Sequence, residues 1–149
     1  MRINIGRVIL GGIVSAIVLF IASGIINGAV LGSAWQEWLR AMGSLNHAPA
    51  EPVGLAIWAV VSLVFGFTGI WIYAGIRPRF GAGPKTALLA GLLLWLAGWL
   101  APALGQLALG AIPPYVTVVG CLGGLGGCLL AVLAGAAVYK ETAGDFQAK

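Results

Sequence analysis

The chain has 149 residues, of which 60% are hydrophobic and only 8% are charged, and its formal net charge is +4. About a quarter of the residues in an ordinary soluble domain are charged, so a chain this poor in charge could not cover a surface that faces water. The composition excludes a soluble globular protein and indicates one domain, 1–149, whose solvent is mostly lipid. The basic residues are also too few to indicate nucleic-acid binding.

Four apolar segments are long enough to cross a bilayer, which takes about 20 helical residues. They are residues 8–31, 53–76, 86–112 and 116–139, and none contains Asp, Glu, Lys, Arg or His. The first follows a basic start, as a signal peptide does, but its apolar run exceeds the roughly 7–15 residues of a signal peptide. We therefore predict an all-α membrane protein with four transmembrane helices in two hairpins.

A short amphipathic helix is expected over residues 33–43, after the first span. Its apolar side chains recur at helical spacing and would share one face: Trp35, Trp38, Leu39 and Met42. Ser33 and Gln36 have the spacing of a capping box, and Gly43 can end the helix in a left-handed conformation. We expect this helix to lie at the membrane interface with its tryptophans at headgroup depth. A lid over a site, or a docking surface, is the alternative.

The loop that follows contains His47, the only histidine of the chain. A neutral imidazole can ligate the magnesium of a chlorophyll or the iron of a haem. A histidine in a loop is more often simply solvated, and a single histidine excludes a bis-histidine haem within one chain. No metal site and no cofactor is therefore predicted here.

The loop RPRFGAGPKTA joins the second and third spans. Pro78 is expected to end one helix, and Pro84 suits the start of the next. Arg77, Arg79 and Lys85 are candidate contacts for anionic lipid headgroups. They also belong to a charge asymmetry, because every Lys and Arg except Arg40 falls on the same side of a four-span arrangement. The positive-inside rule then predicts that both termini and this loop are cytoplasmic.

The stretch WIYAGIRPRFGAGPKTALLAG, residues 71–91, resembles one that recurs in a family of uncharacterised small four-span inner-membrane proteins of bacteria. The likeness extends over most of the chain and includes GRVILGG near the N-terminus. It implies a four-helix membrane fold in a bacterial inner (cytoplasmic) membrane. It implies no activity.

Glycines are concentrated in the fourth span. Helices in lipid associate through close backbone approach, so small residues at helical spacing predict helix contacts. The candidates for helix packing are Gly24, Gly28, Gly120, Gly123, Gly124 and Gly127. A flat ligand such as a pigment or quinone is the alternative occupant of such a groove, with Trp95 and Trp99 as its ring-shaped lining. Cys121 and Cys128 lie about 10 Å apart along one helix, too far for a disulfide.

The spans lack the groups that catalysis or ion transport requires, because they contain no ionisable relay, no nucleophile with a base and no metal cluster. Asn27 and Gln106 are the most informative polar residues. Each follows a basic residue, Arg7 or Lys85, by about the length of a span, so both are expected near the outer leaflet on the first helix of a hairpin. They indicate either hydrogen bonds between helices or a polar vestibule for a neutral substrate.

The function predicted from these features is non-enzymatic. The first hypothesis is an accessory or structural subunit of a larger membrane complex, respiratory or photosynthetic, that acts through helix packing. The second is a small oligomeric channel or exporter for neutral or lipophilic compounds, motivated by Asn27 and Gln106. The partners expected are membrane lipids and other transmembrane helices, in a hetero- or homo-oligomer.

Overall fold

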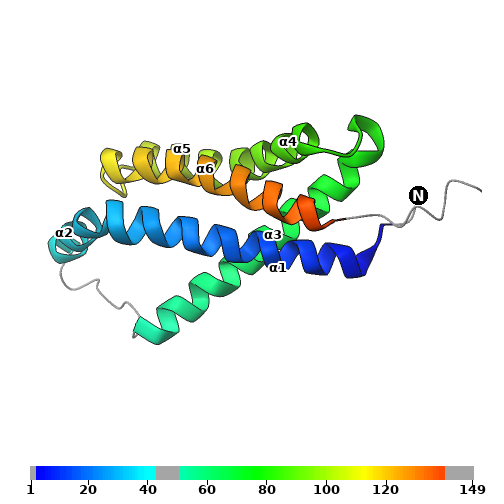
Figure 1. The fold of residues 1–149 in the computed structure, drawn as a ribbon. Coiled ribbons are helices and arrows are strands. Elements are labelled where there is room, and N and C mark those ends of the chain that lie inside the picture. The colour runs from blue at the N-terminus through cyan, green and yellow to red at the C-terminus, as the bar shows by residue number, and fades with distance from the viewer. Residues whose placement is uncertain (1–2, 43–50, 140–149) are drawn as a thin grey trace, which may run out of the picture.

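The computed structural model describes residues 3–42 and 51–139. Four helices are long and apolar enough to cross a membrane, as predicted: Ile5–Val30, Pro52–Phe80, Pro84–Leu109 and Pro114–Val138. They pack antiparallel, each against the next along the chain, and the last packs against the first (Figure 1). The chain is therefore an all-α, multi-pass membrane protein, and its first and last described residues lie at the same end of the bundle.

The first helix of each hairpin contains a π-helical turn. In the first hairpin α1 (Ile5–Gly24) continues as η1 (Ile25–Val30), and in the second α4 (Pro84–Trp95) continues as η3 (Leu96–Leu100) and α5 (Ala101–Leu109). The π-helical turn of the second hairpin ends two residues before Pro102. Pro102 has no N–H to donate, and the wider turn lets the Ala101 N–H donate to the Leu96 carbonyl instead.

The amphipathic helix after the first span is present as α2 (Gly32–Met42). Its start differs from the prediction: Ser33 lies inside the first turn, so the capping box is wrong. The chain enters α2 almost directly from η1, and the Trp35 N–H donates to the Leu31 carbonyl at 2.9 Å. The rings of Trp35 and Trp38 pack edge to face, 5.6 Å apart. Gly43, the expected end of this helix, is outside the described residues.

The second span forms α3 (Glu51–Phe80) and continues through Pro78, which was expected to end it. A proline in the last turn removes a single hydrogen bond, so the helix tolerates it there. Gly81 ends the helix with a φ of +83°, and its N–H donates to the Arg77 carbonyl at 2.9 Å. After this turn α4 begins at Pro84, as predicted.

The tightest packing lies where glycines let backbones touch. A Cβ placed on Gly66 of α3 would lie 2.5 Å from the Gly12 carbonyl oxygen of α1, and one placed on Gly91 of α4 would lie 3.0 Å from the Cys128 carbonyl oxygen of α6 (Pro114–Val138). Gly12 and Gly91 were not among the glycines predicted to pack. The buried core around these crossings includes Val8, Leu19, Ile70, Leu94, Ala131 and Val132.

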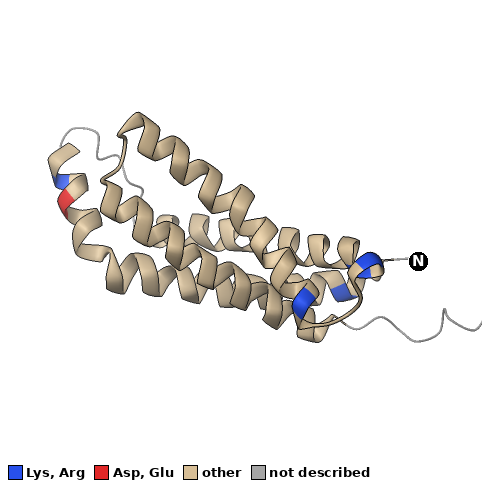
Figure 2. Ribbon diagram, turned by 90° about the horizontal axis from the view of Figure 1, so that it is seen from above, with Lys and Arg blue, Asp and Glu red and all other residues tan. Residues whose placement is uncertain are grey.

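Charge divides the bundle into two ends (Figure 2). Arg7, at the start of α1, and Lys85, at the start of α4, lie with Arg77 and Arg79 of α3 at one end, which we call the basic end. Glu37 and Arg40 lie on α2 at the other, which we call the α2 end. Towards the α2 end the first half of α3 diverges from the other helices (Figure 1), and Trp58 is 60% exposed there.

Candidate functional site

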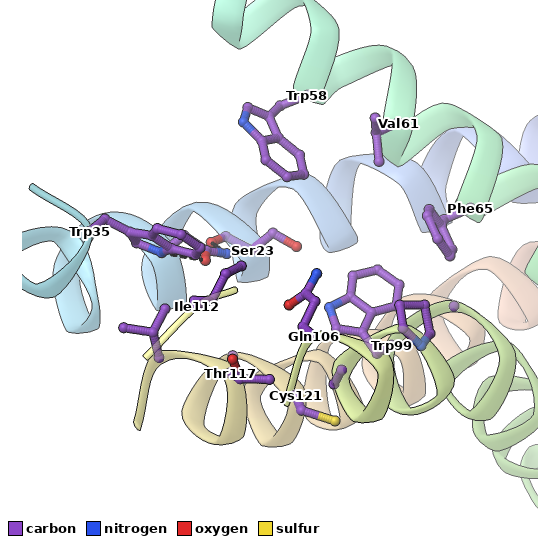
Figure 3. Close-up of a pocket in the computed structure, with 16 residues that line it drawn as sticks. Ser23, Trp35, Trp58, Val61, Phe65, Trp99, Gln106, Ile112, Thr117 and Cys121 are labelled. Atoms are coloured by element: carbon purple, nitrogen blue, oxygen red, sulfur yellow. Dashed lines mark hydrogen bonds between the residues drawn. The ribbon is translucent and has the colours of Figure 1, made fainter. Parts of the chain in front are cut away.

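A cavity of about 280 Å³ lies at the α2 end, between the diverging half of α3 and the rest of the bundle (Figure 3). Its walls come from α1, η1, α2, α3, η3, α5 and α6. None of the described residues that line it is charged. Its aromatic members are Trp35, Trp58, Phe65 and Trp99, and its polar side chains are Ser23, Asn27, Gln106, Thr117 and Cys121. The site is thus an apolar pocket with a few uncharged polar groups, the usual composition of a small-molecule site.

Asn27 lies in the π-helical turn η1, at one side of the cavity. Its Nδ2 donates to the Ser23 carbonyl at 3.0 Å, and its Oδ1 accepts from Trp35 Nε1 at 3.2 Å. The second bond connects the first span to α2. Each amide atom can form one further hydrogen bond, so Asn27 has capacity left for a ligand.

Gln106 lies on α5 and points into the same cavity, towards the space between Trp58 and Trp99 (Figure 3). Its amide makes no hydrogen bond to the described part of the chain. The two residues singled out from the sequence as a possible polar site, Asn27 and Gln106, therefore line one cavity. They do not bond to each other, but the bond from Trp35 Nε1 to Asn27 Oδ1 joins the first span to α2.

Trp99 is held in the cavity wall by contacts on two neighbouring helices. Its ring packs against Phe65, with centroids 4.5 Å apart, and lies directly over Gly124 of α6. Gly98, in the same π-helical turn, leaves room for the Phe65 ring. Trp95 has a different role from the ring lining that was proposed for it, because its Nε1 donates to the Cys121 carbonyl at 2.8 Å and so ties α4 to α6.

The predicted packing glycines fall into two groups. Side chains of neighbouring helices pack against Gly123, Gly124 and Gly127. A Cβ placed on Gly120 would lie 3.7 Å from Leu31 Cδ1, an ordinary van der Waals contact. Gly24 and Gly28 differ, since no heavy atom lies within 4 Å of the place a Cβ would occupy on either of them. Both instead line a second hollow, of about 310 Å³, between the first span and α3.

The basic residues proposed for lipid headgroups lie at the opposite end from the cavity. Arg77 is half-buried, with its guanidinium carbon 5.5 Å from the centre of the Tyr139 ring. Tyr139 in turn packs edge to face on Tyr73. Arg79 and Lys85 are exposed. The cluster is therefore independent of the cavity.

The remaining candidates yield no metal centre in the described ranges, 3–42 and 51–139, where no three His, Cys, Asp or Glu side chains come together. His47 is outside those ranges. Cys121 and Cys128 are free thiols, as predicted. Comparisons with protein-family models, curated proteins and solved structures match nothing to this chain.

Proposed function

We propose that this membrane protein binds a neutral amphipathic small molecule in the cavity at the α2 end, without converting it chemically. The cavity offers aromatic faces and uncharged hydrogen-bonding groups together. A cavity of roughly 150 Å³ accepts a benzene ring, so the volume here suits a larger head group, such as a substituted ring or a glycerol ester. No lining residue pairs a nucleophile with a base, so the proposal contains no catalytic step.

The observation that carries the proposal is the Gln106 side chain. Gln106 is half-buried in the cavity wall and its amide has no partner among the described residues, so a ligand with a carbonyl or hydroxyl oxygen would supply hydrogen bonds that the protein does not. Asn27 offers a further donor and acceptor on the facing helix. Because the described lining carries no charge, an ionic head group would enter without a counter-charge, which disfavours it.

The test is to purify the intact chain in a mild detergent and to identify the small molecules that it retains by mass spectrometry of an organic extract. We expect the wild type to retain a neutral amphiphile and the Gln106→Leu variant to lose it. Thr68→Val is the matched control, since Thr68 is exposed and bonds only to Val64 of its own helix. Identical extracts from wild type and Gln106→Leu would overturn the proposal.

We propose further that the protein lies in a bacterial inner membrane with both termini in the cytoplasm. The four-span fold and the basic residues at one end support this orientation. The cavity would then lie in the outer leaflet, on the side away from the cytoplasm.

A role as an accessory subunit, the first hypothesis from the sequence, ranks below ligand binding because of the glycines. Gly123, Gly124 and Gly127 are occupied by side chains of this chain itself, which leaves less small-residue surface for another protein. A channel or exporter would need a path through the basic half, where the Gly12 and Gly66 backbones touch. Binding at one leaflet needs no such path, so we rank it first. Stable co-purification of another membrane protein, with no retained small molecule, would favour the subunit.

A further inference from the structure

We infer that the ligand of the cavity carries a single alkyl or isoprenoid chain, and that this chain lies in the second hollow, between the first span and the diverging half of α3. The inference rests on the proposed function, since it assumes that the cavity holds the head group. It assigns the hollow lined by Gly24 and Gly28, which the sequence indicated only as packing positions or as a groove for a flat ligand, as the site for the alkyl or isoprenoid chain.

The two hollows are neighbours. Ser23, Asn27 and Trp58 line both of them. Trp58 projects from α3 into the space above the cavity (Figure 3) and is 60% exposed, so its ring stands at the boundary between the two. A molecule whose head reaches Asn27 and Gln106 therefore has a direct route for its remainder into the second hollow.

The chemistry of the second hollow differs from that of the cavity. Its other lining residues are Phe20, Gly24, Gly28, Leu55 and Ser62, of which only the serine is polar. Ser62 makes no hydrogen bond to the described residues, but a serine hydroxyl can rotate towards a carbonyl of the preceding helical turn, so it does not require a polar ligand. Hydrocarbon is the chemistry that such a surface accepts.

The shape of the hollow follows from its glycines. Gly24 and Gly28 are one turn apart on the first span, and nothing lies within 4 Å of the place a Cβ would occupy on either. Larger residues at these positions would fill the space between the first span and α3. The glycines keep it open along the helix, which is the direction an extended chain takes in a bilayer.

Two sources supply a neutral oxygen-bearing head with one chain: glycerol monoesters and prenylated quinones. The probes are therefore two pairs, each with the same head: glycerol monobutyrate and monolaurate, and a ubiquinone ring without a chain or with a decyl chain. Binding to the intact protein in phosphatidylcholine nanodiscs is followed by tryptophan fluorescence. The pair that binds identifies the source.

The decisive variant is Gly28→Leu, which fills the hollow and leaves Gln106 untouched. We expect this variant to raise the Kd of the probe with the long alkyl tail roughly tenfold and to leave the Kd of the probe with the same head and a short tail or none unchanged. Gly126→Leu is the matched control, because Gly126 also has nothing within 4 Å and lines neither hollow. It should change neither. Gln106→Leu should weaken both members of the pair that binds.

A second measurement does not depend on how Gly28→Leu folds. Bromine atoms on the alkyl tail of the probe quench the fluorescence of nearby tryptophans. Trp58→Phe should therefore remove much of the quenching that saturates with probe concentration. Trp71→Phe is the control and should not, because Trp71 is also exposed but does not line the hollow. If binding requires Gln106 but is the same with and without the alkyl tail of the probe and is unchanged in Gly28→Leu, this inference is overturned and the proposed function still stands. No binding of any probe would overturn this inference, and the comparison of organic extracts would then decide the proposed function separately. A dimer that Gly28→Leu dissociates would show that a helix of a second copy occupies the hollow instead.

Discussion

Gly11 of α1 and Gly135 of α6 meet backbone to backbone. A Cβ on Gly11 would lie 2.8 Å from the Gly135 carbonyl oxygen, and a Cβ on Gly135 would lie 2.5 Å from the Gly11 carbonyl oxygen. Neither residue tolerates even a methyl group without moving a helix. The contact joins the first span to the last in the basic half of the bundle, so it closes the ring of four helices there.

Replacement of Gly135 by Ala should therefore destabilise the bundle. Alanine forms helix more readily than glycine, by about 1 kcal/mol, but overpacking a close contact costs about 1–3 kcal/mol, and here backbone would have to move. We expect a net loss of stability, measured by thermal or SDS-induced unfolding in detergent. Gly126→Ala, with open space around it, should be neutral or slightly stabilising. Equal stabilities of the two variants would show that the contact is absent in the membrane.

Leucine at Gly124 or Gly127 should disrupt the protein more than Leu129→Ala. At Gly124 it would collide with the Trp99 ring, and at Gly127 it would separate α6 from Leu19, whose Cδ1 lies 3.3 Å from the added Cβ. Leu129→Ala only removes part of a half-buried side chain. Size-exclusion profiles and unfolding in SDS would rank the three variants. Gly124→Leu should also shift tryptophan emission, and an unchanged spectrum would contradict the position of Trp99.

Asn27→Ala and Gln106→Ala should differ in their effect on stability. Asn27→Ala loses the bond from Trp35 Nε1, and a hydrogen bond between membrane helices is worth about 0.6–2 kcal/mol. Gln106→Ala breaks no bond to the described residues, so its free energy of unfolding should stay close to that of the wild type. Retained ligand should nevertheless fall in Gln106→Ala. If Gln106→Ala unfolds more easily than Asn27→Ala, Gln106 has a structural role instead.

Both termini should be cytoplasmic. Alkaline phosphatase fused after Lys149 should be inactive, and the same enzyme inserted at His47 should be active, because phosphatase folds only after export. This orientation is expected because the basic residues cluster at the basic end of the bundle, and basic residues favour the cytoplasmic side. Green fluorescent protein at the two sites, which requires the cytoplasm, should give the opposite pattern. An active phosphatase after Lys149 would reverse the orientation and place the cavity in the inner leaflet.

The number of spans and the amphipathic helix α2 were predictable from residue types alone. A helix in lipid must satisfy its own backbone and cross about 30 Å of hydrocarbon, so an uncharged run of sufficient length is enough to identify it. Trp35 and Trp38 likewise mark one face of α2, because the polar residues Gln36, Glu37 and Arg40 are spaced to lie on the other. In both cases the solvent imposes the pattern, and no knowledge of neighbouring helices is needed.

Which small residues meet was decided only by the tertiary structure. A face of a membrane helix is apolar whether it contacts a partner or lipid, so Gly24 and Gly11 look alike along the chain, although only Gly11 touches another backbone. At the crossing of α1 and α3 the small residues are spaced four apart, Gly12 with Ala16 on α1 and Ser62 with Gly66 on α3. Gly24 and Gly28 have the same spacing but contact no other helix, so the spacing alone does not identify the crossing. The same ambiguity concealed the divergence of α3.

The cavity shows the same division between the two levels. The positions of Asn27 and Gln106 along their spans placed both near one end of the bundle, since 1.5 Å per residue converts sequence distance into depth. Whether they face each other, the lipid or a common space depends on how the helices are rotated. The π-helical turns η1 and η3 set that rotation, each by a backbone change that no pattern of apolar residues records. The sequence therefore determined how deep Asn27 and Gln106 lie in the membrane. That they share one cavity was decided by helix packing, because contact with lipid does not fix how a helix is rotated about its axis.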